Sequence, residues 1–223
     1  MDCALSPRKT RSATFKTRIR LITIMLKILA AGDFHNDHLC ATRLAERATK
    51  ENVDLIILNG DLVEEDQPHG IIGHFVNTKK KLVLVPGNHD LLATEFLANL
   101  YGVKNLHGAY MIQNGIGICG FGGANCGMNA LSEEDIYAEL KASFEQIKHL
   151  STTIMVTHVH PSGTHMEQFS SFIKGSIGLR KAIESCKPTV VICGHVHEAE
   201  GIEEKIGSTT VINVGKSGKT LTL

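Results

Sequence analysis

Residues that could bind metal ions occur at five points along this chain, each where an apolar run gives way to a polar loop. They stand in the segments GDFH (32–35), GDL (60–62), PGNHD (86–90), THVHP (157–161) and GHVHE (194–198). The candidate ligands are Asp33, His35, Asp61, Asn88, His158, His195 and His197. Carboxylate, imidazole and amide groups together suit Mn, Fe, Zn or Co, whereas Ca and Mg sites use oxygen ligands alone. The sequence therefore predicts a transition-metal centre.

Two of these segments have a spacing that favours a shared ligand position. Asp33-x-His35 and His195-x-His197 each place two candidates on alternate residues. Alternate residues of an extended segment point the same way, so each pair can converge on one locus. A glycine also stands within each of four ligand segments, where a missing Cβ lets the backbone bend and a substrate approach closely.

The elements that must position these residues alternate along the chain. Strand-like apolar runs occupy 26–31, 55–58, 82–85, 154–156 and 189–193, and helical patterns occupy 39–51, 69–78, 91–100, 132–150 and 177–186. Such alternation predicts an α/β layered fold. In open α/β sheets, ligand-binding groups collect at the carboxyl ends of the strands, which is where the candidate ligands stand.

Two further segments, 109–121 and 201–221, have the pattern of β-hairpins. Asn114-Gly115 and Gly207-Ser208 supply their turn residues. The glycine-rich stretch 120–127 is expected to form a loop at the rim of the site. No internal repeat and no linker is visible, so the sequence predicts one domain over residues 25–223.

Composition narrows the possible partners. Of the 23 basic and 23 acidic side chains, residues 1–20 hold six and one, which leaves 17 basic and 22 acidic side chains in residues 21–223. A body with a net charge of about −5 is a poor non-specific ligand for nucleic acid, which such proteins bind through Lys and Arg. The apolar run 21–31 has about half of the roughly 20 residues that a membrane span needs, and Lys27 interrupts it.

The six cysteines include no CxxC pair and no disulfide-rich cluster. Reduced thiols are typical of a cytoplasmic protein, which is the location that we expect. Residues 1–24 are basic and rich in Ser and Thr, and they allow three interpretations. They could be a disordered arm, a transit-like segment, or the result of a start codon placed too early. We favour the third, because Met25 opens the first apparent core strand.

The five segments together resemble those of the calcineurin-like metallophosphoesterase superfamily, in order and at plausible spacing, over residues 26–215. The resemblance implies a single-domain, four-layer α/β/β/α sandwich with two divalent metal ions at one edge. Mn2+ is favoured, with Fe, Zn, Co or Ni as alternatives. Within the superfamily, the chain looks most like small phosphoesterases grouped with cyclic-nucleotide phosphodiesterases.

The resemblance also implies a role for each site residue. Asp33, His35 and His197 would bind the first metal; Asn88, His158 and His195 would bind the second; Asp61 would bridge both. The nucleophile would be a hydroxide shared by the metals, whose pKa they lower. His89 would donate to the leaving group or the phosphoryl oxygens, and Asp90 would hold the tautomer of His89.

Other polar residues receive weaker roles. We expect His160 at the rim or behind a ligand, His38 and His165 as candidates for the mouth of the pocket, and Lys174 or Arg180 as anion contacts. Asn213 is expected to secure a strand end. His69, His74, His107 and His149 belong to no motif, and surface or packing roles are the default for them.

The sequence thus predicts hydrolysis of a phosphodiester bond in a small substrate, such as a cyclic nucleotide. A phosphomonoesterase or protein phosphatase is one alternative, and a non-catalytic scaffold is another. A scaffold would be expected to lose a ligand or the catalytic histidine, whereas all are present here. A DNA-repair nuclease would be expected to carry a basic track, which an acidic body does not favour.

Overall fold

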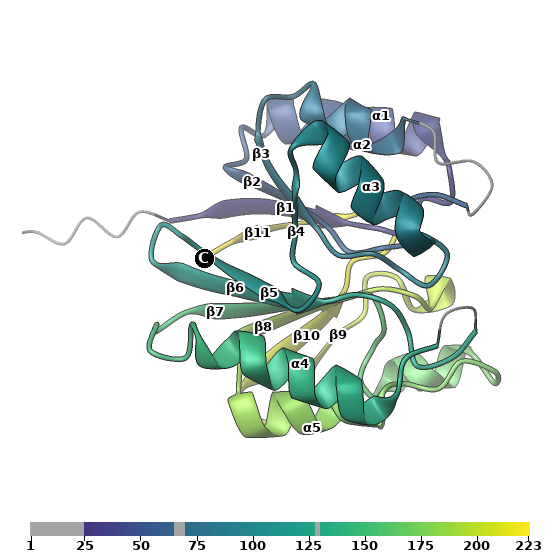
Figure 1. Cartoon of the computed structure of the whole chain (residues 1–223), viewed down its shortest axis with the longest axis vertical. Coiled ribbons are helices and arrows are strands. Elements are labelled where there is room, and N and C mark those ends of the chain that lie inside the picture. The colour runs from purple at the N-terminus through teal and green to yellow at the C-terminus, as the bar shows by residue number, and fades with distance from the viewer. Residues whose placement is uncertain (1–24, 65–69, 128–129) are drawn as a thin grey trace, which may run out of the picture.

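Two β-sheets face each other in the computed structural model, and helices cover their outer faces (Figure 1). The structure describes residues 25–64, 70–127 and 130–223. The predicted extension, residues 1–24, lies outside these residues, so its interpretation stays a prediction. The four-layer α/β/β/α arrangement expected from the sequence is confirmed.

The first sheet has the order β11-β1-β2-β3-β4. Its strands are β1 (Lys27–Ala31), β2 (Leu55–Leu58), β3 (Lys81–Leu84), β4 (Lys104–Asn105) and β11 (Lys219–Thr222). Its helices are α1 (His38–Lys50), α2 (Ile71–Val76) and α3 (Leu91–Tyr101). β1, β2 and β3 pair in parallel, with Ile28 opposite Leu55 and Leu55 opposite Lys81.

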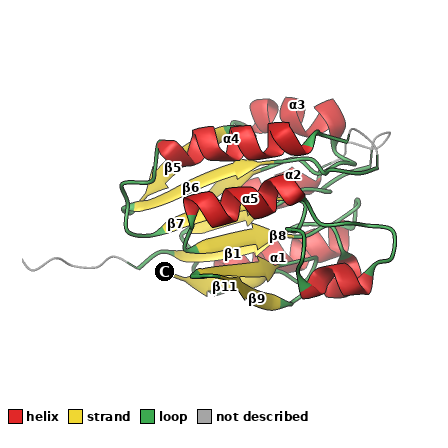
Figure 2. Cartoon of the chain, turned by 90° about the horizontal axis from the view of Figure 1, so that it is seen from below, coloured by secondary structure: helices red, strands yellow, loops and turns green. Residues whose placement is uncertain are grey.

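The second sheet has the order β5-β6-β7-β8-β10-β9. Its strands are β5 (Ala109–Gln113), β6 (Ile116–Phe121), β7 (Thr153–Thr157), β8 (Val190–Cys193), β9 (Glu203–Ile206) and β10 (Thr209–Asn213). Helices α4 (Glu133–Glu145) and α5 (Ile177–Cys186) lie side by side across it (Figure 2). Two 3-10 turns follow β7 and β8: η1 (His165–Phe169) and η2 (His197–Ala199). β6, β7, β8 and β10 are parallel neighbours.

The core explains why the central strands read as unbroken apolar runs. Along β1, Ile28 and Ala30 pack between the two sheets, whereas Leu29 and Ala31 pack under the helices of the first sheet. A strand that is buried on both faces shows no polar alternation. The parallel strands of both sheets end on the same side of the molecule, and this side carries the candidate ligands (Figure 1).

Side-chain caps fix where the helices begin. The Asp37 carboxylate accepts the backbone N–H of Cys40 at the start of α1, and Ser132 and Ser176 cap α4 and α5 in the same way. The predicted helix 132–150 ends earlier, at Glu145, and continues as turns. α2 is shorter than the predicted 69–78, because Gly70 precedes it in the left-handed region with a φ of 66°. Residue 69 lies outside the described residues.

The hairpin predictions are partly right. β5 and β6 form a hairpin around Asn114-Gly115, and β9 and β10 form one around Gly207-Ser208. The prediction for 201–221 is wrong beyond β10, because β11 crosses to the first sheet and pairs antiparallel with β1, with Lys27 opposite Thr222. The turn between β10 and β11 therefore lies beside the carboxyl end of β1. Among the helices of the described residues, none is both long and apolar enough to cross a bilayer.

Candidate metal centre

The structure brings the predicted ligands to one edge from the ends of five strands. Asp33 and His35 follow β1, Asp61 follows β2, and Asn88, His89 and Asp90 follow β3. His158 follows β7, while His195 and His197 follow β8. Both sheets therefore contribute to the site, which lies across the seam between them.

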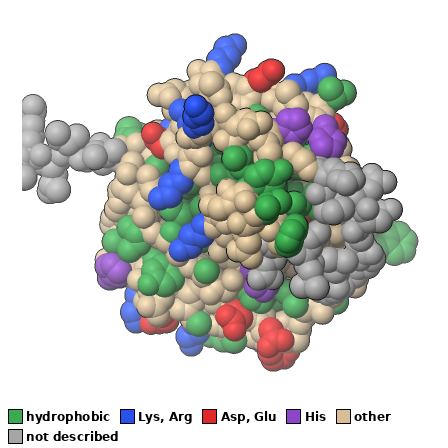
Figure 3. Space-filling view, turned by 45° about the horizontal axis from the view of Figure 1, so that its top comes forward, with side chains coloured by type: hydrophobic (Ala, Val, Ile, Leu, Met, Phe, Trp, Pro, Cys, Tyr) green, Lys and Arg blue, Asp and Glu red, His purple; other side chains and the backbone are tan. Residues whose placement is uncertain are grey.

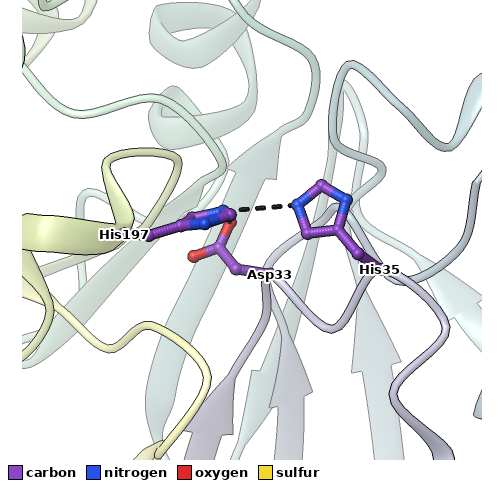
Figure 4. A group of neighbouring side chains, drawn as sticks. All are labelled: Asp33, His35 and His197. Atoms are coloured by element: carbon purple, nitrogen blue, oxygen red, sulfur yellow. Dashed lines mark hydrogen bonds and ion pairs between the residues drawn. The ribbon is translucent and has the colours of Figure 1, made fainter.

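One cluster consists of Asp33, His35 and His197, whose ligand atoms all lie within 4.8 Å of one another. The two imidazole rings point toward each other, and the Asp33 carboxylate lies beside the His197 ring (Figure 4). The His35 Nε2 lies 3.2 Å from the His197 Nε2, which in turn lies 3.8 Å from the Asp33 Oδ1. Asp33 is buried, His35 is partly exposed, and the His197 side chain is 55% exposed. We call this group the open cluster.

A second cluster consists of Asp61, His158 and His195, and all three are buried. We call it the buried cluster. The His158 Nε2 lies 3.0 Å from the His195 Nδ1 and 3.2 Å from the Asp61 Oδ2. The same Asp61 oxygen lies 3.6 Å from the His35 Nε2 of the open cluster. One carboxylate oxygen therefore faces both clusters.

The remaining predicted ligand, Asn88, is buried in the loop between β3 and α3. The next residue, His89, donates its backbone N–H to the Asp61 Oδ1 at 2.9 Å. This hydrogen bond holds the loop that carries Asn88 against the buried cluster.

The backbone is strained at several of these residues. Asp33, His35, Asp61 and His195 have positive φ angles of 55°, 45°, 48° and 73°. Non-glycine residues rarely adopt this region, and such strain gathers at functional sites, where the surroundings enforce it. Two glycines are needed for a different reason, because a side chain at either position would collide with a carboxylate. A Cβ on Gly87 would lie 2.0 Å from the Asp61 Oδ1, and one on Gly194 would lie 2.6 Å from the Asp33 Oδ2. These glycines make room for the carboxylates of the protein itself.

The charged groups of the buried cluster interact strongly with one another. Burial opposes ionisation of Asp61, but the charge of His158 and the hydrogen bonds from His158 and His89 outweigh it, so the pKa of Asp61 is lowered. Burial likewise opposes the charge on His158, yet Asp61 and Asp33 raise its pKa to about 9. The His158 Nδ1 donates to the Asn59 carbonyl at 3.0 Å, which leaves Nε2 directed at Asp61. A proton on Nε2 thus occupies the position that a metal ion would take, and metal binding must release it.

The third member of the buried cluster behaves differently. Burial and the charge of His158 lower the pKa of His195 to about 3, so its ring is neutral and has a lone pair to offer. Its Nδ1 faces His158, and its Nε2 lies 3.7 Å from the Cys126 Sγ. This contact places the glycine-rich loop 120–127 at the site, as the sequence predicts, with its first residues belonging to β6.

The structure corrects the predicted role of Asp90. Its buried carboxylate accepts the backbone N–H groups of Leu62, Val63 and Gly87 at 2.6–2.9 Å, and among the described residues it is Glu64, not Asp90, that lies within hydrogen-bond distance of the His89 Nδ1. Asp90 therefore ties the loop after β2 to the loop after β3. Burial, followed by the charge of Asp61, raises the pKa of Asp90 to about 6.

Glu64 contacts His89 instead. Its Oε2 lies 3.2 Å from the His89 Nδ1, and its Oε1 lies 2.6 Å from the His35 Nδ1. One carboxylate thus orients both a ligand of the open cluster and the predicted acid. Glu64 carries no motif of its own, and its position three residues after Asp61 is the only signal in the sequence.

The remaining predicted residues lie outside both clusters. His160 is fully buried, which excludes the rim and leaves the position behind a ligand, and its ring nitrogens have no hydrogen-bond partner among the described residues. His38 pairs with His74, and His165 pairs with Glu204. Arg180 pairs with Glu184. Asn213 does secure a strand end, since its amide donates to the Val196 carbonyl at 3.0 Å.

A cavity of about 590 Å³ opens above the open cluster. Its walls are formed by Asp33, His35, Glu64, His89, His197, Glu200 and Lys216. Neither His38, His165, Lys174 nor Arg180 belongs to this lining. Lys216, which belongs to none of the sequence motifs, lines the cavity instead of Lys174 or Arg180.

Two facing sheets with a pair of His/Asp clusters at their shared edge define a dimetal phosphoesterase-like enzyme. The model of the calcineurin-like phosphoesterase superfamily domain matches residues 26–222. The chain belongs to this superfamily and is a metal-dependent phosphoesterase.

The similar proteins agree on the fold. TT1561 of Thermus thermophilus superposes with a TM-score of 0.72 at 20% identity, over 89% of this chain and 98% of that one. A dimetal phosphatase from Danio rerio has a TM-score of 0.61 at 11% identity, over 85% and 87% of the two chains. GAP50, described as the anchor in the inner membrane complex of Plasmodium, has a TM-score of 0.59 at 13% identity, over 86% and 71%.

A curated relative is the UPF0046 protein K07C11.7 of Caenorhabditis elegans. It is 37% identical over 68 residues, which are 30% of this chain and 23% of that protein. The match therefore spans under a quarter of the relative's length.

Proposed function

We propose that this chain hydrolyses phosphodiester bonds of a small substrate with the help of two Mn2+ ions. The observation that carries the proposal is the single Asp61 oxygen that faces both clusters, at 3.6 Å from the His35 Nε2 and 3.2 Å from the His158 Nε2. Two cations held close together need an anionic bridge, and Asp61 is placed to supply it.

The two clusters support the ligand sets that the family resemblance implies. Asp33, His35 and His197 would hold the first ion; Asn88, His158 and His195 would hold the second. The mixture of carboxylate, imidazole and amide oxygen suits Mn2+, and Fe, Zn, Co or Ni are the alternatives. When bound, the ions supply a nucleophilic hydroxide of lowered pKa and neutralise charge on the phosphoryl group.

The protein would supply the proton for the leaving group and would hold the catalytic residues in position. His89 lines the cavity beside His35, with the two ring centroids 4.9 Å apart. In its imidazolium form, His89 donates its Nδ1–H to Glu64 and keeps its Nε2–H to donate to the leaving group or to a phosphoryl oxygen. Asp90 would act indirectly, because its carboxylate holds together the loops that bear Asp61 and His89.

The cavity supports a small, polar substrate. A volume of about 590 Å³ falls within the range of roughly 300–1,000 Å³ that small-molecule sites occupy. The lining residues in the described part of the chain are all charged or histidine, so they offer hydrogen bonds and charge to a polar substrate. A cyclic nucleotide is one substrate to test.

Two alternatives have specific support. A phosphomonoesterase is supported by the shared fold of the protein described as a dimetal phosphatase. A scaffold is supported by the shared fold of GAP50, which is described as an anchor. Both clusters and His89 are intact here, which favours catalysis over a scaffold role.

The test uses two chromogenic esters of one leaving group. Purified protein is given bis-p-nitrophenyl phosphate or p-nitrophenyl phosphate, each with Mn2+ and with a chelator. We expect Mn2+-dependent release of p-nitrophenol, faster from the diester; 2′,3′- and 3′,5′-cyclic AMP are then assayed in the same way. A preference for the monoester would establish the first alternative, and no turnover by folded protein with any of the five metals would overturn the enzyme assignment.

The expected surroundings complete the proposal. We propose a cytoplasmic location, which the free thiols of the five described cysteines support. No stable binding of nucleic acid is expected from a body with an excess of acidic side chains. On the face that Figure 3 shows, Lys and Arg side chains are spaced among other side-chain types.

A further inference from the structure

We propose that Lys216 forms an anion-binding subsite next to the metal centre and thereby selects phosphoesters that carry a second negative group. This inference rests on the proposed function and adds to it a class of substrate. The second group would be a carboxylate or a further phosphoryl group on the substituent that extends away from the scissile phosphorus.

The turn that carries Lys216 is firmly built. It joins β10 to β11, and the Glu200 carboxylate accepts the backbone N–H groups of Lys216 at 3.0 Å and Ser217 at 3.2 Å. From the other side, the Arg47 guanidinium donates to the carbonyls of Ser217 and Gly218 at 3.1 and 3.3 Å. A side chain on a turn held from both sides starts from a fixed backbone position, so less ordering is needed when it binds a ligand.

The charges of the cavity leave one cation for this role. Among the described residues, Lys216 is the only Lys or Arg that lines the cavity. Glu200 lines it too, but both of its carboxylate oxygens accept hydrogen bonds from the turn. The positive charge of Lys216 at this wall is therefore the one feature that favours an anionic substituent over a neutral one.

Lys216 already has one partner, and this partner leaves it available. Its Nζ lies 2.7 Å from the Asp37 Oδ2, with the two side chains 41% and 37% exposed. A solvent-exposed ion pair of this kind contributes little, and an ammonium group has three donors. The pair with Asp37 holds the side chain at the cavity wall while at least one donor remains for a ligand.

The position of Lys216 relative to the open cluster determines how long the substituent of the substrate must be. Asp33, His197 and Lys216 line one continuous cavity. A substrate whose phosphoryl group lies at the open cluster can therefore reach Lys216 with a short substituent. Lys174 and Arg180 are outside the lining, and Arg180 is paired with Glu184.

The experiment compares substrates that differ only at the end of one substituent. The three substrates are p-nitrophenyl ethyl phosphate, its 2-carboxyethyl analogue and its 2-phosphonoethyl analogue, all with Mn2+. The quantity measured is the ratio of kcat/KM for each anionic ester to that for the ethyl ester. The two anionic esters distinguish a carboxylate ligand from a phosphoryl ligand. If only monoesters are cleaved, phenyl phosphate and 4-carboxyphenyl phosphate give the corresponding ratio.

We expect the wild-type ratio to exceed one and Lys216→Met to lower it about tenfold, the effect of losing a hydrogen bond to a charged group. Lys216→Glu should lower it further and favour a 2-aminoethyl ester. Lys219→Met is the matched control, because Lys219 lies three residues after Lys216, contacts Glu203 of β9 and lies outside the cavity lining.

The outcomes separate the two proposals. Hydrolysis of the ethyl ester with a ratio that Lys216→Met and Lys216→Glu do not change overturns the subsite and leaves the proposed function standing. A fall of equal size in Lys219→Met also overturns it, because the effect is then one of general charge. A wild-type protein that cleaves no ester with any metal overturns the proposed function itself, and the subsite with it.

Discussion

The two clusters of the metal centre share Asp61 as a neighbour but differ in their surroundings. In the buried cluster, the side chain of His158 is 0% exposed and that of Asp61 is 3% exposed, whereas His197 in the open cluster is 55% exposed. Charges in the buried cluster act in a low dielectric, where their pairing is strong and their isolation costly. The open cluster faces the cavity and can exchange water and substrate. We therefore expect a division of roles, in which an ion in the buried cluster would anchor the site and an ion in the open cluster would meet the substrate.

The clusters also resemble each other in one respect. Each takes residues from both sheets: His35 and His197 follow β1 and β8, and Asp61 and His158 follow β2 and β7. A bound ion in either cluster would therefore link the two halves of the sandwich. Metal binding should stabilise the fold as well as activate the site, because an ion that binds only the native state shifts the unfolding equilibrium.

The largest effect is expected where the two clusters meet. Asp61→Asn removes the charge that faces both, so both metal affinities should fall by more than about a hundredfold, beyond the 10–100-fold that loss of an outer-shell partner costs. Activity should be lost with them. Metal content measured by mass spectrometry after equilibrium dialysis checks this. Loss of one ion alone would show that Asp61 holds a single ion rather than bridging the two.

The next largest effect concerns the wall of the open cluster. His89→Ala should lower kcat about 10²–10⁴-fold, the usual contribution of a positioned acid, while two metal ions per chain remain. Glu64→Gln, which keeps the shape but removes the charge near the His89 Nδ1, should cause a smaller fall in kcat. Steady-state kinetics measures kcat for each variant, and titration of metal into each variant measures the number of ions bound. If His89→Ala loses an ion, His89 is a ligand rather than an acid.

Stability separates the clusters more directly. In metal-free protein, His158→Ala leaves Asp61 and Asp33 buried without their partner, and it should lower the free energy of unfolding by about 3–5 kcal/mol. His197→Ala changes an exposed side chain and should cost within about 0.5 kcal/mol. Urea unfolding measures both. Equal losses would contradict the contrast between a buried and an open cluster.

Much of this fold could be predicted from the sequence because it depends on interactions between residues that are close together in the chain. The predicted bounds of β2 match the observed ones, since a parallel strand buried on both faces is an unbroken apolar run ended by a turn. The ligands at the strand ends could be predicted for the same reason, because Asp61 and His158 come shortly after the ends of such runs.

The rest depends on contacts between distant segments. β11 is a four-residue strand with partly exposed side chains, so nothing in its pattern indicates that it leaves the hairpin for β1. Asp90 follows His89 in sequence, which favours a pairing of the two, but a helix starts at the next residue and the carboxylate turns to the loop after β2. Glu64 reaches His35 and His89 only once the loops after β1, β2 and β3 lie together.

The proton on His158 gives the buried cluster its own dependence on pH. The pKa of His158 rises from 6.5 to about 9 on folding, so the stability that this proton contributes is complete below pH 6.5 and is lost as the pH rises through 9. A metal ion must displace the proton, and its affinity should therefore rise up to about tenfold per pH unit between pH 6.5 and 8.5. Isothermal titration with Mn2+ in buffers of different ionisation enthalpy measures the proton released. An affinity that stays flat over this window would mean that His158 is neutral before metal binds.

The smallest predicted effect tests how the buried cluster is supported. The His195 Nε2 lies 3.7 Å from the Cys126 Sγ, while its Nδ1 faces His158, so the thiol is the hydrogen-bond acceptor behind a proposed ligand. Outer partners of ligating histidines fix the ring orientation, and their loss costs about 10–100-fold in metal affinity. A sulfur acceptor at this distance makes a weak bond, so Cys126→Ala should weaken one ion at the low end of this range, about tenfold.

Cys126→Ser should keep part of the affinity, because its hydroxyl can also accept a hydrogen bond. Cys186→Ala is the matched control, since this thiol contacts Ser185 on α5 and takes no part in either cluster. Competition with a fluorescent chelator resolves the two affinities. If Cys126→Ala weakens both ions equally, or neither, the contact with His195 does not support the buried cluster. A change confined to the weaker of the two ions would mean that the buried cluster binds its ion more weakly than the open cluster does.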